Sequence, residues 1–173
     1  RCQGSLRTTG FLLDPDTIER LNDSGLSTLQ LSIDSRERSR NGYIQKSFDH
    51  LRRKLDMVCH LAVFEAHATV VLCPETLPGF GKLLAALKQF PIRVSVNLVH
   101  DAKGESLVHG LPYLDAWKAH FSGSHVFSRL EQEYGASLLR GQPQDWHCRA
   151  GERSLYVDEF GEVQYCASQR GRV

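Results

Sequence analysis

Residues 28–34 read Thr-Leu-Gln-Leu-Ser-Ile-Asp, and this alternation of polar and apolar residues predicts a β-strand. The predicted strand carries Ser32 and Asp34 at its carboxyl end. Residues 69–73 form a continuous apolar run that is closed by Pro74, a pattern typical of a strand buried on both faces in a parallel sheet. Two further strands are predicted at residues 6–9 and 92–99.

Helical segments separate these predicted strands. Asp14 can cap free backbone N–H groups, and Pro15 suits the first position of a helix, which Gly25 then ends. Residues 43–64 predict a long helix, because apolar residues recur within it at spacings of three and four. A shorter helix is predicted at residues 83–90. This alternation of strand and helix predicts the α/β class, with parallel strands joined by helices.

The composition is that of an ordinary folded protein. The chain has 173 residues, of which 41% are hydrophobic and 24% charged, and this excludes a disordered, collagen-like or coiled-coil chain. The formal net charge of +1 offers no basic excess for nucleic acid, and the longest apolar run, residues 68–73, is too short to span a membrane. Five widely spaced cysteines favour a reduced, cytoplasmic setting. Cys59 and Cys73 are expected to be buried apolar side chains.

Polar residues gather where the predicted strands end. Parallel strands place their carboxyl ends at one edge of a sheet, and this edge carries the functional site in α/β proteins. The candidates at this edge are Thr9, Ser32, Asp34 and His100. Ser32 and Asp34 can equally well cap the loop after their strand, and His100 can either line a pocket or make a structural hydrogen bond. Both interpretations remain open.

The last third of the chain contains a predicted β-hairpin between two cysteines. The helical patterns lie at residues 113–121 and 126–134, and the strand patterns at residues 155–158 and 163–166, around a Glu-Phe-Gly turn. Cys148 precedes the hairpin and Cys166 ends it, so the hairpin would bring the two thiols close. Thiolates bind iron–sulfur clusters and zinc, both of which usually take four ligands. A hairpin with two buried cysteines has the same spacing, so a purely structural role stays open.

Several motifs resemble radical SAM enzymes. The spacing C-x12-G-x4-C from Cys148 to Cys166 is similar to the opening of the SPASM and twitch extensions of that family. Residues 8–13, TTGFLL, resemble its TNG-x-L-L strand end, with Thr9 in place of the usual Asn. Two further stretches resemble its L-x-x-S-G-L and v-x-i-S-i-D-S segments, namely LNDSGL at residues 21–26 and LQLSIDS at residues 29–35.

This resemblance implies a fold, a reaction and two cofactors. The fold is a partial, open TIM-like barrel of parallel strands with outer helices over residues 1–145, followed by the start of a SPASM or twitch extension over residues 146–173. The reaction is the reductive cleavage of S-adenosylmethionine (SAM) at a [4Fe–4S] cluster, which generates a 5′-deoxyadenosyl radical for hydrogen abstraction. The implied partners are a reductant such as flavodoxin or ferredoxin and a peptide or small-metabolite substrate.

The resemblance also assigns roles to single residues. Ser32 and Asp34 would contact the methionyl group or the ribose of SAM, because a hydroxyl and a carboxylate accept hydrogen bonds from ammonium and hydroxyl groups. The full implied set is Thr9, Ser32, Asp34 and His100 for SAM, and Cys148 and Cys166 for an auxiliary [4Fe–4S] cluster.

Part of the family pattern is absent. The chain has no three-cysteine loop, so we expect a fragment of the enzyme whose first two βα units precede Arg1. By itself, this fragment is expected not to cleave SAM. It is also expected to expose the edge of its first strand. A second class fits as well: a non-catalytic α/β binding module in which His147, Cys148 and Cys166 bind zinc or form a structural hairpin. A barrel aldolase would need a lysine at a strand end, and no predicted strand ends in lysine.

Overall fold

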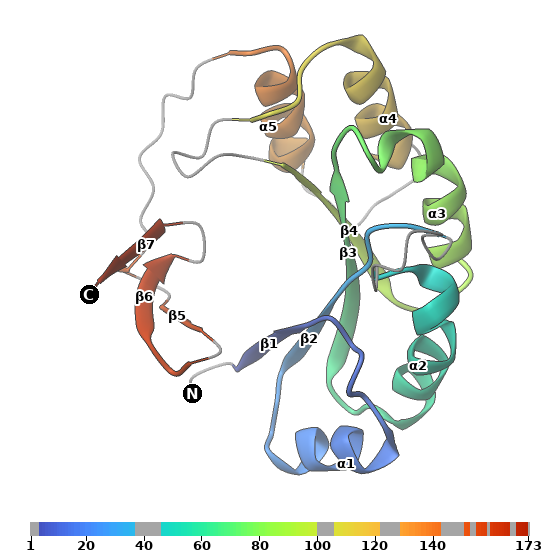
Figure 1. Ribbon diagram of the computed structural model, residues 1–173, viewed down its shortest axis with the longest axis vertical. Helices are drawn as coiled ribbons and strands as arrows, with labels where there is room; N and C mark the ends of the chain where they lie inside the picture. The colour runs from blue at the N-terminus through green and yellow to red at the C-terminus, as the bar shows by residue number, and fades with distance from the viewer. Residues whose placement is uncertain are drawn as a thin grey trace.

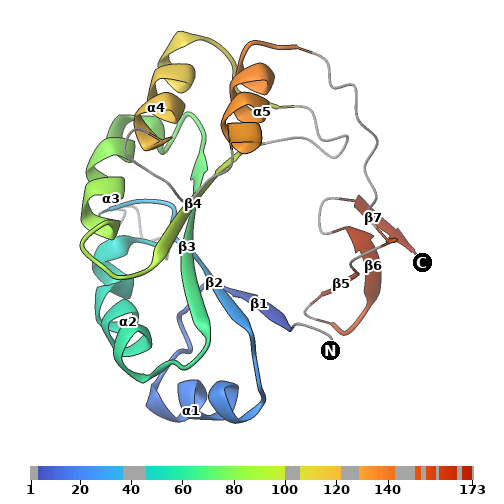
Figure 2. The same cartoon turned by 180° about the vertical axis from the view of Figure 1, so that it is seen from behind.

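Strand and helix alternate through the first hundred residues, as the sequence predicts. Figures 1 and 2 show the computed structural model of the chain, which describes residues 4–36, 46–99, 106–121, 129–142, 151–152, 155–158, 160–166 and 169–172. The strands are β1 (Ser5–Thr8), β2 (Thr28–Ser32), β3 (Glu65–Leu72), β4 (Arg93–Leu98), β5 (Tyr156–Val157), β6 (Val163–Cys166) and β7 (Gln169–Arg172). The helices are α1 (Pro15–Asp23), α2 (Phe48–Leu61), α3 (Phe80–Leu87), α4 (Leu111–Phe121) and α5 (Arg129–Leu139), with a 3₁₀ turn, η1 (Leu77–Gly79), before α3.

The first four strands form one parallel sheet in the order β1-β2-β3-β4. Each strand lies beside the one that follows it in the chain, and a helix joins each pair. In both views the helices form an arc on one side of this sheet, and no described helix covers the other side (Figures 1 and 2). The predicted α/β class is therefore confirmed, and the carboxyl ends of four strands lie at one edge.

The described strands form an open sheet. Among the described residues, β1 pairs only with β2 and β4 only with β3. In the described part of the chain β1 therefore lies at the edge of this sheet, and its Leu6 is 39% exposed. Four strands do not establish a TIM-like barrel, so this finer architecture remains a proposal.

The hydrophobic core lies between the sheet and the helices. On the sheet side, Leu29 and Leu31 of β2 are almost completely buried. On the helix side, Leu51, Leu55 and Val58 of α2 are at most 1% exposed, so the predicted spacing of three and four marks the buried face of this helix. Burial of each such side chain contributes roughly 2 kcal/mol, and this packing fixes the sheet against the helical layer.

Helix α1 begins and ends at the predicted residues. Its N-cap Asp14 accepts a hydrogen bond from the Thr17 amide at 2.8 Å, and Pro15 occupies the first turn. Gly25 has a φ of +71°, which is the left-handed conformation expected of a glycine after a helix.

Helix α2 is shorter than predicted, and β3 is longer. Residues 43–45, where the helix was predicted to start, lie outside the described residues, and the observed start follows Ser47, which accepts from the His50 amide. The helix ends at Leu61 rather than continuing through Phe64. The Asn22 side chain donates to the Leu61 carbonyl and accepts from the Val63 amide, both at 2.9 Å, so a contact with α1 holds the turn.

Strand β3 extends four residues before the predicted apolar run, because its pairing with β2 already begins at Thr28 and Glu65. The run was expected to be buried on both faces. The described helices cover only one face, and on the other face Thr69 is buried whereas Val71 is half-buried. The other predicted boundaries shift by a few residues. Helix α3 was predicted at residues 83–90 and lies at Phe80–Leu87, and β4 was predicted at residues 92–99 and lies at Arg93–Leu98. Helix α4 was predicted at residues 113–121 and lies at Leu111–Phe121, and α5 was predicted at residues 126–134 and lies at Arg129–Leu139. Within the part of the chain that the structure describes, no helix is long and apolar enough to cross a membrane.

The predicted hairpin is present, with an additional strand. β5 and β6 pair antiparallel, and the Asp158 carboxylate accepts from the amides of Phe160 and Glu162, both at 2.9 Å, to hold the turn. β7 pairs with β6 and was not predicted. An edge strand of polar residues shows no apolar pattern, because backbone hydrogen bonds alone define it.

Candidate functional site

The helix-free side of the main sheet is lined by polar residues. In β2, Leu29 and Leu31 are buried against the helices, so Gln30 and Ser32 point to the opposite side. Strand β4 shows the same alternation: Val94 and Val96 are buried, whereas Arg93, Ser95 and Asn97 are not. The polar face is therefore built from every second residue of the strands.

Hydroxyl groups form a row across this face near the carboxyl ends of the strands. Ser32 of β2 is aligned with Thr69 of β3, and Thr69 with Ser95 of β4. The hydroxyls of Thr69 and Ser95 are 2.8 Å apart and hydrogen-bonded. Thr8 is aligned with Leu31, so the next residue, Thr9, extends the row beside Ser32. The row brings together two residues that the sequence analysis assigned to one site.

Asp34 lies beyond this row on the same side of the chain. Ile33 is fully buried and its amide donates to the Thr69 carbonyl at 2.9 Å, so the flanking Ser32 and Asp34 face away from the helices. The Asp34 carboxylate forms an ion pair with the Lys46 ammonium at 3.3 Å, and both side chains are about one-third exposed. An ion pair this exposed contributes little to stability, so the carboxylate can exchange its partner for a ligand.

The loop after β1 is held in place beside the row. Gly10 has a φ of +78°, and a Cβ at this position would lie 2.7 Å from a methyl carbon of Leu31, so the chain turns at a position where only glycine fits without displacing the core. The Lys54 ammonium of α2 donates to the carbonyls of Phe11 and Leu13. These contacts fix the backbone that carries Thr9.

The structure places three of the six predicted site residues. Thr9, Ser32 and Asp34 lie at the carboxyl edge of the sheet, as predicted. His100 and Cys148 lie outside the described residues, and Cys166 ends β6 with its side chain outside the described set. The shared thiolate site of Cys148 and Cys166 therefore stays a prediction.

The cysteines with described side chains do not form a metal site. Cys59 lies in α2 and Cys73 follows β3. Both are free thiols, and they are half-buried where the sequence predicts buried apolar side chains. Burial raises the pKa of the Cys59 thiol, and the nearby Asp56 acts in the same direction, so this thiol is less prone to ionise. Among the described residues, no three His, Cys, Asp or Glu side chains are grouped to hold a metal ion.

A second polar row on the same face was missed by the sequence analysis. Arg7, Gln30, His67 and Arg93 are aligned across β1, β2, β3 and β4. Burial lowers the pKa of His67, the positive charges of Arg93 and Arg7 lower it further, and only Glu65 opposes them. The polar positions within residues 28–32 and 93–97 were visible in the sequence, but the alignment between strands was not.

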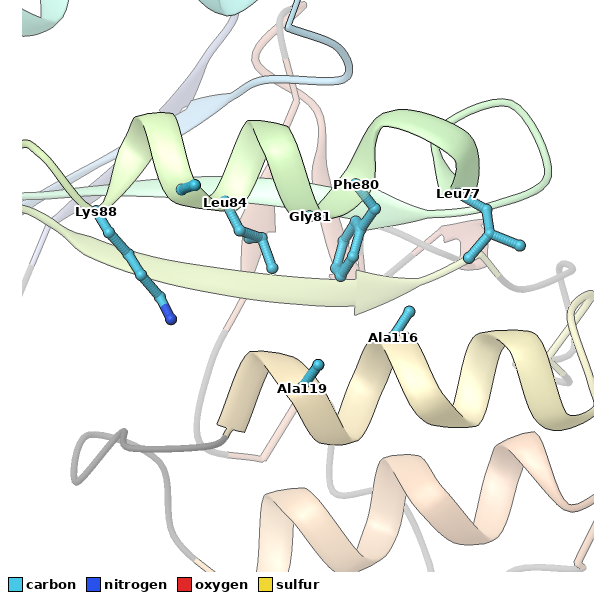
Figure 3. A pocket seen from close by; sticks show the side chains of 8 residues that line it. Leu77, Phe80, Gly81, Leu84, Lys88, Ala116 and Ala119 are labelled. Carbon is cyan, nitrogen blue, oxygen red and sulfur yellow. The ribbon is translucent and has the colours of Figure 1, made fainter.

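A cavity of about 260 Å³ lies elsewhere, in the helical layer. Figure 3 shows Phe80 and Leu84 of α3, and Lys88 directly after it, extending toward Ala116 and Ala119 of α4. The lining is apolar apart from Lys88 and offers no set of converging polar groups, so the polar face of the sheet is the better candidate for a functional site.

No protein-family model and no curated protein matches the chain. Its function is therefore inferred from the polar face of the sheet and from the sequence motifs.

Proposed function

We propose that this chain is part of a radical SAM enzyme, and that SAM binds along the carboxyl edge of β1 and β2. The observation that carries the proposal is the pairing of the adjacent carboxyl ends of β1 and β2 at Thr8 and Leu31, which Thr9 and Ser32 directly follow, with Asp34 just beyond. Two of the motifs that resemble the family, residues 8–13 and 29–35, lie on these same strand ends. The proposed complete fold is a barrel in which the polar face of this sheet lines the interior.

The three side chains suit the groups that SAM carries. A ribose hydroxyl can donate to the Asp34 carboxylate and accept from the Ser32 or Thr9 hydroxyl, and the SAM ammonium can donate to the same acceptors. The hydrogen bond between the Thr69 and Ser95 hydroxyls fixes these two members of the row relative to each other. Lys46 keeps the Asp34 carboxylate at the edge until a ligand donor replaces it.

A [4Fe–4S] cluster would supply the electron that cleaves SAM, and an auxiliary cluster is expected at Cys148 and Cys166. The donors with described side chains do not fit such a cluster, because Cys59 and Cys73 lie on separate elements and no group of three possible ligands is found among the described residues. The role assigned to the described residues is accordingly confined to binding and orienting SAM.

Calorimetric titration of the chain with SAM and with S-adenosylhomocysteine tests the proposal. Ser32→Ala removes a neutral hydrogen bond and is expected to weaken binding about fivefold, whereas Asp34→Asn removes a charge-assisted one and should weaken it about tenfold or more. Ser5→Ala is a matched control, because Ser5 is an exposed residue of β1 at the amino end of the sheet. Wild-type affinity in the double variant S32A/D34N, or no binding to the wild-type chain, would refute the proposed site.

A further inference from the structure

The row Arg7–Gln30–His67–Arg93 crosses all four parallel strands on the helix-free side of the sheet. It lies two residues toward the amino ends from the hydroxyl row, or roughly 7 Å along the strands. Each member is a hydrogen-bond donor, and two are permanent cations.

The row carries an excess of positive charge. The Arg93 guanidinium forms an ion pair with Glu65 at 2.5 Å, and both side chains are about half exposed. Arg7 is exposed, and no described carboxylate pairs with it. After the Glu65 charge is counted, one positive charge remains on this part of the face.

Gln30 and His67 form the centre of the row, and the two arginines form its ends. Gln30 and His67 are half-buried neighbours on β2 and β3, and the two arginines flank them on the outer strands, β1 and β4. The arginines lie about 14 Å apart at the backbone, which leaves room for a group of a few atoms between their extended side chains.

We propose that this row binds an anionic group of a small organic molecule, a carboxylate or a phosphate. Arg7 and Arg93 flank the anion, and Gln30 and His67 donate hydrogen bonds to it from the surface of the sheet. The inference is independent of the proposed function, because SAM would bind at the carboxyl edge and this row lies deeper on the same face.

Anion binding is expected to change the protonation of His67. In the free protein, burial and the charges of Arg93 and Arg7 hold its pKa below the usual value, with Glu65 as the opposing group. A bound anion stabilises the imidazolium, so the pKa of His67 rises and His67 takes up a proton when the anion binds at a pH between the free and bound pKa values. This response distinguishes a ligand at the row from one bound elsewhere.

NMR titration of the histidine side chains tests the proposal, with inorganic phosphate and with succinate as separate probes. The His67 signal is identified by its loss in His67→Gln. We expect saturable binding of one or both probes with a rise in the pKa of His67, and a weakening of about tenfold or more in Arg7→Gln. Arg53→Gln is the matched control, because Arg53 is an exposed arginine in α2, in the helical layer.

The outcomes separate the two chemical sources and the two sites. Saturation by phosphate alone indicates a phosphate ester as the ligand, and saturation by succinate alone indicates a carboxylate; both results support the proposal. Saturation by neither probe overturns it, as does an equal loss of affinity in Arg7→Gln and Arg53→Gln. Arg7→Gln is expected to leave S-adenosylhomocysteine binding unchanged, so this row and the SAM site can fail separately.

Discussion

The protein is expected to lose stability in acid because of one buried histidine. His120 lies in α4 and is only 3% exposed, and burial lowers its pKa from 6.5 to about 4, with the positive charge of Lys88 acting in the same direction. The folded state therefore holds a neutral imidazole at a pH at which the unfolded chain is protonated. Protonation favours unfolding, so stability falls as the pH drops from 6.5 toward 4.

The size of the effect follows from the two pKa values. One pKa unit corresponds to about 1.4 kcal/mol, so the shift from 6.5 to about 4 removes about 3 kcal/mol once the pH lies below both values. About 2 kcal/mol is already lost at pH 5. The loss is a large part of the roughly 5–15 kcal/mol by which a folded domain is typically stable.

Urea denaturation at several pH values measures this loss. His120→Gln and His120→Leu do not titrate, so the free energy of unfolding should fall less steeply with decreasing pH in both variants than in the wild type. His67 contributes a smaller loss in the same direction to all three proteins, so the difference between them isolates His120. His60→Gln, at an exposed position of α2, is the control. Equal pH dependence of the wild type and both His120 variants would refute the reasoning.

Three further predictions concern local contacts and the metal. Asn22→Ala should lower the free energy of unfolding by about 1–2 kcal/mol, because both bonds to the turn after α2 are lost; Asn97→Ala, exposed on β4, should cost less. Lys54→Met should raise the Kd for S-adenosylhomocysteine if its bonds to the loop after β1 position Thr9, and an unchanged Kd with intact folding contradicts that role. Reconstitution with iron and sulfide should give a brown protein whose iron content falls in the double variant C148A/C166A, whereas bound zinc without colour supports the alternative zinc hairpin.

Local sequence signals determined much of the first hundred residues. The Asp14 cap, Pro15 and Gly25 fix the limits of α1 through interactions within a few residues, so they could be predicted correctly. The end of α2 could not, because it depends on Asn22, a residue far away in the chain whose side chain bonds to the turn. Strand β3 likewise extends beyond its apolar run because β2 pairs with it.

The candidate site likewise has residues that the sequence predicts and residues that only the tertiary structure brings together. Thr9, Ser32 and Asp34 were predictable, because polar residues after apolar strands mark the carboxyl edge of a parallel sheet. The alternation in β2 and β4 was also visible in the sequence. However, only strand pairing aligns Arg7 with His67 and Arg93, because register depends on how distant segments pack against one core. The sequence alone therefore determined the strands and their polar ends, whereas the tertiary structure decided which polar side chains share a row.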